Sequence, residues 1–411
     1  MKKIKITFEH KQIEVEENTT YLEISKYSQK KDIALAVKKE NELFPLTTRA
    51  IKDETIEFID ASSIEGAKIY KAAIKFILEV ALKTVFPTSD IDYLHSVPGG
   101  MLGEIEYDRI LTKEDISKIK EEMAKIIDEN CEFKRYNILK KEAADFYEAT
   151  SYYEKAINVK TCDDIVTIYK LKDYLNYYYV PMPYSTGCIK QFELKYLDNN
   201  RLIILYPSNL TKGRLPEYVH HENIINAYYE GKSWLKRLNA PYVADLNNLV
   251  ANRGMKGFIE SCELHFTDEI KKACDKIIRN NDKKFVMIAG PSSSGKTTTT
   301  RILGAYLRSK GYDPICLSTD DYFVDREDTP KDEFGAYDFE CLNAIDTRQF
   351  NEDLMQLLKG KEVNIPTFNF VTGKREYHNH VIKLNENSII LIEGLHSLND
   401  DLTPGIPERY K

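Results

Sequence analysis

The chain has 411 residues, of which 42% are hydrophobic and 30% carry a charge at neutral pH. This length indicates two to four domains, and the composition excludes a disordered or fibrous chain because it supplies apolar residues for several cores. A formal net charge of −7 argues against a broadly basic surface that coats nucleic acid, although it allows a local basic patch.

The sequence carries no sign of secretion or of membrane insertion. Seven cysteines, an odd number without a C-x-x-C pair, indicate reduced thiols rather than a disulfide framework. No stretch has the uninterrupted apolar length of a membrane span, and residues 1–5 lack an apolar signal core. We therefore expect a cytoplasmic protein without a membrane partner.

Residues 1–60 form the first predicted unit, which is rich in β-strand. Residues 3–8 and 12–15 alternate between apolar and polar side chains, as strands with one buried face do. Residues 21–27 fit one short amphipathic helix, and residues 55–59 supply a further strand. A hairpin, a helix and later strands predict a β-grasp fold. Because the unit contains no catalytic constellation, we interpret it as an interaction module.

A second predicted unit covers residues 61–205. Ser62-x-x-Glu65 reads as a capping box, and apolar residues follow at helical spacing as far as Leu82. Leu111-Thr112-Lys113-Glu114-Asp115 opens another helix, whose acidic first turn suits the helix dipole. Residues 174–180 hold four tyrosines. These either stack on a base or a sugar or occupy half-buried positions of a sheet, and we favour the sheet.

The first 205 residues resemble one family of enzymes. Residues 1–60 resemble the TGS domain at the start of threonyl-tRNA synthetases, and residues 61–205 resemble the second additional domain of the same enzymes. The run from Leu111 to Asp115 carries the best match, followed by Lys120-Glu121-Glu122-Met123. The resemblance implies an α+β fold like that of the synthetase editing domain, and contact with RNA through these N-terminal domains.

In the synthetases this domain edits mischarged tRNA with an H-x-x-x-H pair on its first helix and a later cysteine and histidine. The matching helical positions here hold Tyr70 and Ile74, and Cys188 is followed by Phe192 where a histidine is needed. One ligand out of four cannot hold zinc. We therefore expect the fold without the editing activity.

Residues 206–282 predict a connector, because prolines and glycines interrupt them repeatedly. The pair His220-His221 has no cysteine or acidic partner at metal-ligand spacing, so we do not interpret it as a metal site. Thr267-Asp268-Glu269 caps a predicted helix that leads towards the next strand.

The segment that follows carries the most specific motif of the chain. Gly290 to Thr297 has the G-x-x-x-x-G-K-[ST] spacing of a phosphate-binding loop, after an apolar strand at 285–289 and before a helix that ends near Gly311. The glycines let backbone N–H groups wrap an anion, and the helix adds its positive dipole end. Lys296 supplies a charge for the outer phosphates, and the Thr297 hydroxyl can ligate Mg²⁺. The residues expected to hold a nucleoside triphosphate are Gly290, Ser292, Ser293, Ser294, Gly295, Lys296, Thr297 and Thr298.

Acidic residues follow two later strands of this last unit. The strand at 314–318 ends before Asp320 and Asp321, and the strand at 388–392 ends at Glu393. In a doubly wound parallel sheet, the carboxyl ends of the strands form the ligand-binding edge. A carboxylate there either takes the proton of an attacking hydroxyl or merely caps the next segment. We favour Asp320 as the base, and we expect Glu393 to serve Mg²⁺.

Five runs in this order resemble the phosphoribulokinase and uridine kinase family. They are Gly290–Thr297, Leu317–Asp320, Tyr337–Glu340, Pro366–Phe370 and Ile392–His396. The resemblance implies a nucleoside kinase on a P-loop doubly wound parallel sheet, with ATP and Mg²⁺ as cofactors and a nucleoside 5′-hydroxyl as the acceptor.

The resemblance also assigns roles to single residues. Asp320 becomes the general base, with Lys296 as the second catalytic residue, and Glu393 joins Thr297 as a magnesium-associated group. Substrate contacts fall to Glu340 on the ribose hydroxyls, to Phe368 against the base and to Arg375. Phe368 fits an ordinary core position equally well. Gly373 stands where uridine kinases have a base-contacting histidine, so the identity of the nucleoside stays open.

The last predicted unit, residues 283–411, is shorter than the ~200 residues expected of this kinase fold. We therefore expect an incomplete kinase sheet, truncated at its C-terminus before an arginine-rich lid, and weak or absent turnover from these residues alone. The alternative hypothesis is a nucleotide-binding regulatory or RNA-binding protein that uses the TGS-like and synthetase-like domains without turnover.

Overall fold

The computed structural model describes residues 2–280, 282–333 and 335–411 of the chain. These residues form two compact units, Met1–Gly254 and Met255–Lys411. The division falls inside the segment that the sequence predicts as a connector, so the two parts of that segment belong to different units. Within the described ranges, no helix is both long enough and apolar enough to cross a bilayer.

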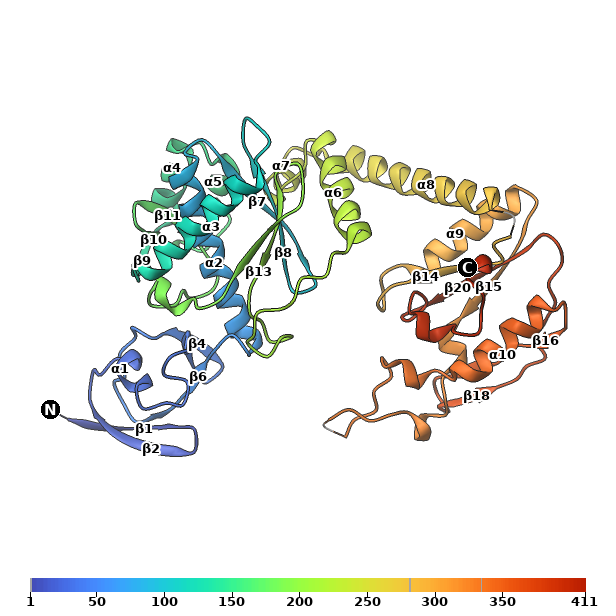
Figure 1. Cartoon of the computed structure of the whole chain (residues 1–411), viewed down its shortest axis with the longest axis horizontal. Helices are drawn as coiled ribbons and strands as arrows, with labels where there is room; N and C mark the ends of the chain where they lie inside the picture. The colour runs from blue at the N-terminus through green and yellow to red at the C-terminus, as the bar shows by residue number, and fades with distance from the viewer. Residues whose placement is uncertain (1, 281, 334) are drawn as a thin grey trace. The chain divides into compact units, whose positions relative to one another are not determined.

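The first unit begins with two small sheets around one short helix (Figure 1). β1 pairs antiparallel with β2 and parallel with β5, while β3 lies between β4 and β6. The buried side chains of Ile4, Ile6 and Phe8 on β1 share a core with Tyr21 and Phe58. The elements are β1 Lys3–Phe8, β2 Lys11–Glu16, α1 Tyr21–Ser25, β3 Ala36–Lys39, β4 Glu42–Pro45, β5 Glu54–Thr55 and β6 Glu57–Ile59.

The larger part of the first unit surrounds the apolar helix α2, Ile64–Val85, which contacts α3, β7 and β10. A four-stranded antiparallel sheet has the order β12-β13-β8-β7, and a three-stranded sheet has the order β11-β10-β9. The strands are β7 Asp90–Val97, β8 Gly100–Glu106, β9 Lys134–Leu139, β10 Ile165–Leu171, β11 Tyr174–Tyr177, β12 Glu193–Tyr196 and β13 Arg201–Leu205. The other helices are α3 Lys113–Asp128, α4 Lys140–Ala149 and α5 Tyr153–Lys160.

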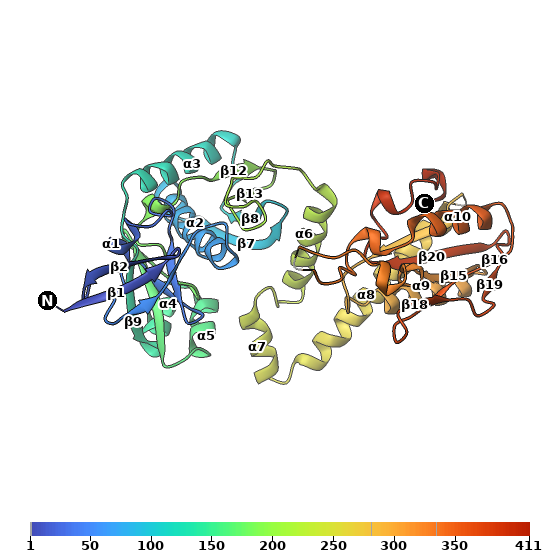
Figure 2. The same cartoon turned by 90° about the horizontal axis from the view of Figure 1, so that it is seen from below.

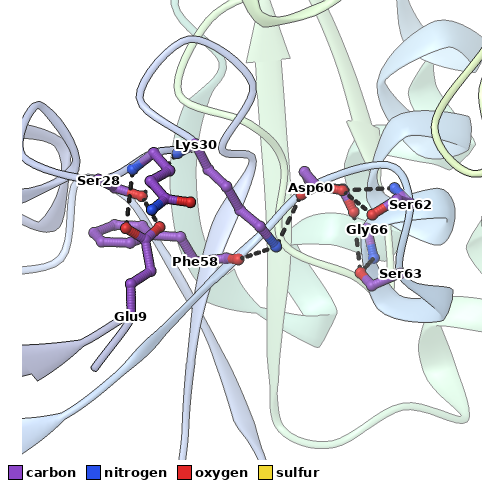
Figure 3. A network of polar contacts seen from close by, with 9 residues as sticks. Glu9, Ser28, Lys30, Phe58, Asp60, Ser62, Ser63 and Gly66 are labelled. Carbon is purple, nitrogen blue, oxygen red and sulfur yellow. Dashed lines mark hydrogen bonds and ion pairs between the residues drawn. The ribbon is translucent and has the colours of Figure 1, made fainter. Parts of the chain in front are cut away.

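The start of α2 differs from the prediction. The predicted capping box begins at Ser62, but the residue that caps the helix is Ser63, whose hydroxyl accepts a hydrogen bond from Gly66 N at 3.0 Å. Ser62 instead donates its backbone N–H and its hydroxyl to the carboxylate of Asp60 (Figure 3). The prediction is wrong because Asp60 competes for Ser62, and sequence spacing alone does not reveal that competition.

The same carboxylate fastens α2 to the preceding small sheets. Lys30 Nζ lies 2.8 Å from Asp60 Oδ2 and donates to the carbonyl oxygen of Phe58 at 3.0 Å (Figure 3). Burial alone would raise the pKa of Asp60, but the hydrogen bonds from Lys30 and Ser62 bring it below its usual value. A Cβ atom on Gly66 would lie 1.7 Å from the carbonyl oxygen of Asp60, so this close approach requires glycine.

Two helices of the predicted connector, α6 Glu222–Arg237 and α7 Val243–Ala251, belong to the first unit. Lys232 of α6 reaches the sheet, where its Nζ lies 2.6 Å from Asp92 Oδ2 and 2.5 Å from Glu104 Oε2. The next helix, α8 Met255–Arg279, belongs to the second unit. The predicted cap at Thr267 is wrong, because α8 continues through that residue while Asp268 and the acid after it pair with lysines three residues later.

The second unit is built on three parallel strands in the order β14-β20-β15. Alternate side chains of β20 serve opposite faces of the sheet. Ile389 and Leu391 pack with α8 and α9, whereas Ile390 and Ile392 pack with α10 on the other face (Figure 1 and Figure 2). The main elements are β14 Phe285–Ala289, α9 Lys296–Ser309, β15 Asp313–Ser318, α10 Thr347–Leu358 and β20 Ser388–Gly394. Two small antiparallel pairs are β16 Val363–Asn364 with β19 Val381–Ile382, and β17 Thr367–Asn369 with β18 Lys374–Glu376.

Candidate functional site

The phosphate-binding motif joins β14 to α9, as its spacing predicts. The loop leaves β14 after Ala289 and reaches the first helical residue at Lys296. Gly295 caps α9 with a φ of +89°, a conformation that favours glycine. A Cβ atom on Gly290 would lie 2.5 Å from Ser294 Oγ, so a larger residue there would force the Ser294 side chain to move. The two glycine positions of the motif therefore differ: Gly295 has a backbone conformation that favours glycine, and Gly290 has a close side-chain neighbour.

The loop presents its polar groups outward at the beginning of a 14-residue helix. The Lys296 side chain lies over the loop, and its Nζ donates to the carbonyl oxygen of Pro291 at 3.1 Å. Free N–H groups at a helix start and the positive end of the dipole favour a bound anion. The exposed residues of the predicted nucleotide site are Ser292, Ser293, Ser294, Gly295, Thr297 and Thr298.

The register of the sheet brings the strand ends to one edge. Ala289 of β14 pairs with Gly394 of β20, and Ser318 of β15 pairs with Glu393. The structure places Thr297 beside Glu393, with Thr297 Oγ1 2.8 Å from Oε1 and 2.9 Å from Oε2 of the carboxylate. These two residues, predicted from separate stretches of sequence, lie in direct contact.

The donor set of this pair fits Mg²⁺, which prefers oxygen ligands and usually takes only one or two of them from the protein. Thr297 and Glu393 supply a hydroxyl and a carboxylate at a helix start that favours phosphate groups. In the described part of the chain, no cluster of three or more His, Cys, Asp or Glu side chains is arranged to hold a metal. A metal at this edge would therefore share its ligands with a bound nucleotide.

The acid residues after β15 lie in a 3₁₀ turn, Thr319–Tyr322, which we call the acid turn. Asp320 and Asp321 are both half-buried. Burial raises the pKa of the Asp320 carboxyl, and the positive charge of Lys296 offsets part of this rise. Burial also raises the pKa of Asp321, whose Oδ1 accepts a hydrogen bond from Phe368 N at 3.4 Å. Asp321 thus binds the backbone of β17, whereas the charged group that influences the pKa of Asp320 is Lys296 of the phosphate loop.

The acid turn and the end of β20 approach each other closely. A Cβ atom on Gly394 would lie 1.8 Å from Thr319 Oγ1, so only glycine permits this approach. The Thr319 side chain is fully buried, and its hydroxyl has no hydrogen-bond partner among the described residues. The dipeptide Glu393-Gly394 therefore combines a carboxylate at the edge with the space that the acid turn requires.

The three predicted substrate residues occupy different environments. Phe368 is 4% exposed and packs edge to face against Phe323 and Phe370, with ring centroids 5.5 Å and 5.2 Å away. Phe370 is 61% exposed, so it presents the open aromatic face of this cluster. Glu340 has an exposed side chain, and its backbone oxygen lies 2.8 Å from His396 Nε2 in the segment after β20.

Arg375 lies opposite Phe368 in the β17–β18 pair. Its Nη2 contacts Asp346 Oδ2 at 2.9 Å, and its Nη1 is buried without a hydrogen-bond partner in the described structure. Asp346 is the N-cap residue of α10. The guanidinium of Arg375 is thus engaged with the start of α10, a contact that sequence spacing did not suggest.

In the first unit, the positions compared with the editing ligands, Tyr70, Ile74 and Cys188, are buried in the core. The Tyr70 hydroxyl accepts hydrogen bonds from the backbone N–H groups of Lys190 and Gln191 at 3.0 Å and 2.9 Å. Burial raises the pKa of this tyrosine to about 12, and it also raises the pKa of the buried Cys188 thiol. His220 is bound by Tyr218 and Glu222 on either side of its ring.

Comparison with known proteins finds two separate similarities, one to a family of kinases and one to tRNA ligases. Residues 285–404 match the model of the Phosphoribulokinase / Uridine kinase family. A uridine kinase of Ligilactobacillus salivarius is 30% identical over 122 residues, which cover 30% of this chain and 55% of that protein. A solved structure described as a possible uridine kinase from Bacillus stearothermophilus is 25% identical and covers 34% of this chain and 77% of that one, with a TM-score of 0.30.

The second similarity is to threonine–tRNA ligases. The ligase of Symbiobacterium thermophilum is 28% identical over 163 residues, and that of Halalkalibacterium halodurans is 30% identical over 168 residues. Each match covers 39% of this chain and about a quarter of the ligase, 25% and 26% respectively. The chain thus spans about a quarter of the length of these ligases and 55% of the uridine kinase. The two family resemblances predicted from the sequence are confirmed.

Proposed function

We propose that the second unit is an ATP-dependent kinase that phosphorylates the 5′-hydroxyl of a nucleoside, with Asp320 as general base. The observation that carries the proposal is the meeting of three groups at one sheet edge: the phosphate loop after β14, Asp320 after β15 and Glu393 at the end of β20. Kinases of this kind need little covalent chemistry from the protein, because positioning and charge account for most of the catalysis.

Each group has a distinct part in the transfer. The loop N–H groups and Lys296 hold the phosphates of ATP, and Thr297 with Glu393 would hold Mg²⁺, which neutralises phosphate charge when it is bound. Asp320 accepts the proton of the nucleoside hydroxyl while the oxygen forms its bond to the γ-phosphorus and ADP leaves. Partial burial supports this role, because it raises the pKa of Asp320 and so makes its carboxylate a stronger base.

The aromatic cluster beside the acid turn supports a planar acceptor. Phe370 exposes its ring next to the buried Phe368 and the half-buried Phe323, and an aromatic ring offers a stacking surface for a nucleobase. The exposed Glu340 carboxylate supplies an acceptor for sugar hydroxyls. We therefore place the nucleoside between these residues and Asp320.

The test combines nucleotide binding with turnover. Calorimetric titration with Mg·ATP should give binding that Lys296→Ala abolishes or weakens at least tenfold. A panel of ribonucleosides should then show ADP formation that depends on one or more members of the panel. Asp320→Asn should remove this activity while Mg·ATP still binds, and Asp321→Asn serves as the neighbouring control. ATP consumption that needs no nucleoside, or that survives Asp320→Asn, would count against the proposal.

A second candidate function rests on the first unit. Because that region is similar to threonine–tRNA ligases, we propose that it contacts structured RNA. Filter binding of labelled tRNA to the chain, compared with single-stranded RNA of equal length, tests this role. Equal and salt-labile binding of both RNAs would indicate nonspecific attraction only.

A further inference from the structure

The acid turn is anchored at its far end by one side chain. Tyr322, the last residue of the turn, is fully buried although Asp320 and Asp321 remain partly open to solvent. Its ring packs edge to face on Phe350 of α10, with centroids 4.9 Å apart. The orientation of the turn therefore depends on α10, whereas the phosphate loop leads into a different helix, α9.

The Tyr322 hydroxyl has a polar partner in the core. It donates to Asp353 Oδ2 at 3.1 Å, and Asp353 Oδ1 accepts from Gln349 Nε2 at 2.8 Å. Asp353 is 3% exposed, and no lysine, arginine or histidine nitrogen lies within ion-pair distance of it in the described structure. Burial raises its pKa, while these two hydrogen bonds, and more distantly Arg375, act in the opposite sense; the nearby carboxylate of Glu352 adds to the rise.

Placing the carboxylate of Asp353 in the core costs desolvation free energy, because its hydrogen-bond donors carry no charge. Apolar residues of similar volume usually stabilise a core at least as well, so the stability of the core does not by itself account for this polar pair. The hydrogen bond from Tyr322 to Asp353 fixes the rotation of the tyrosine ring, which packing on Phe350 alone does not determine.

The backbone at Tyr322 is held by the same helix. The N–H of Asp346, the N-cap of α10, donates to the carbonyl oxygen of Tyr322 at 2.8 Å. Asp346 also accepts from Gln349 N at 2.9 Å and from Arg375 at 2.9 Å. The carbonyl oxygen and the hydroxyl of Tyr322 therefore both form hydrogen bonds with the beginning of α10, at its N-cap and in its second turn.

We propose that Tyr322 and Asp353 are positioning residues for Asp320. The proposal rests on the proposed function of Asp320 as the base and assigns to α10 the task of holding that base at the sheet edge. The acid turn has only four residues, so any rotation at Tyr322 moves the carboxylate two residues before it. Displacements near 1 Å cost orders of magnitude in transfer reactions.

The decisive variant is Tyr322→Phe, which keeps the buried ring and removes only the hydroxyl. We expect faster hydrogen exchange confined to residues 318–324 and a fall in kcat of roughly 10- to 100-fold, with the KM for ATP changed less than twofold. The ¹³C carboxyl resonance of Asp320, identified by its loss in Asp320→Asn, should shift. Tyr306→Phe on α9, whose hydroxyl has no hydrogen-bond partner in the described structure, is the matched control and should change none of these quantities.

Two variants of the partner separate positioning from packing. Asp353→Asn keeps an oxygen that accepts from the Tyr322 hydroxyl, and the Gln349 amide can turn over so that its oxygen accepts from the new NH₂ group. This variant should therefore preserve the exchange rates and the Asp320 resonance. Asp353→Leu removes the acceptor, so it should reproduce the effect of Tyr322→Phe.

Each result decides one question. A lower melting temperature for Tyr322→Phe with an unchanged Asp320 resonance and unchanged exchange in the turn would overturn the proposal and leave a purely structural role. If Asp320→Asn keeps full turnover, the proposed base is wrong, yet the exchange and resonance measurements still report whether Tyr322 and Asp353 hold the turn.

Discussion

At the scale of single residues, the surroundings of Asp320 determine how it titrates. The carboxyl is half-buried at the end of β15, and burial raises its pKa more than the charge of Lys296 lowers it. In the proposed reaction Asp320 acts as a base in its deprotonated form, so its contribution is complete above the raised pKa and disappears as the pH falls through it.

The first prediction concerns pH. The acid limb of kcat/KM should have a midpoint above 3.8, the ordinary value for an aspartate, because burial disfavours the charged form of Asp320. A pH profile measured with saturating Mg·ATP and varied nucleoside checks this. An acid limb at or below 3.8 would show that a different group limits the rate.

The second prediction concerns the close approach at Gly394. Gly394→Ala should destabilise the second unit by about 1–3 kcal/mol, since its Cβ would lie 1.8 Å from Thr319 Oγ1 and force the acid turn to move. Gly304→Ala on α9 is the control, because its Cβ would meet its nearest neighbour at 3.6 Å and alanine favours a helix interior by ~0.5–1 kcal/mol. Urea unfolding of the two variants should therefore move in opposite directions.

At the scale of elements, local motifs and tertiary contacts differ in what they allow one to predict. The strand Phe285–Ala289, its loop and the following helix are encoded within a few adjacent residues, and the sequence predicts them closely. The contact between Thr297 and Glu393 also follows, because parallel strands end at one edge.

Other features depend on residues distant in the chain. The pairing of Tyr322 with Asp353 spans 31 residues, and nothing in either segment marks it. The helix α8 begins at Met255 rather than at the cap expected near Thr267, because a polar triplet that resembles a cap also fits the exposed face of a continuing helix. The burial of Phe368 likewise depends on two other phenylalanines, one of them 45 residues earlier.

The third prediction concerns the cap of α2. Ser63→Ala should lower the free energy of unfolding of the first unit by about 0.5–2 kcal/mol, because the N–H of Gly66 loses its acceptor. Ser117→Ala within the exposed part of α3 is the control and should be neutral or slightly stabilising. Chemical unfolding followed by far-ultraviolet circular dichroism measures both. Equal effects of the two substitutions would refute the assignment of the cap to Ser63.

At the scale of the whole molecule, the two units offer separate optical signals. The single tryptophan of the chain, Trp234, lies on α6 in the first unit, whereas the phosphate loop lies in the second. A ligand stabilises only the part of a protein whose folded form binds it.

The fourth prediction follows from this division. At a concentration 100 times its Kd, Mg·ATP should stabilise the second unit by about 2.7 kcal/mol. The unfolding transition followed by tryptophan fluorescence should stay in place, while a second transition seen by circular dichroism should shift upwards. Lys296→Ala should abolish the shift. A tryptophan transition that moves together with the other would show that the two units unfold cooperatively.

The strand order β14-β20-β15 has a consequence for how far a local change can spread along this sheet edge. The strand that delivers the phosphate loop and the strand that delivers the acid turn are separated by β20, so the two stand ~10 Å apart across the sheet. The acid turn forms hydrogen bonds with α10 and with β17, and neither of these elements belongs to the loop between β14 and α9. A substitution in α10 or in the β17–β18 pair should therefore alter the acid turn and leave the conformation of the phosphate loop unchanged.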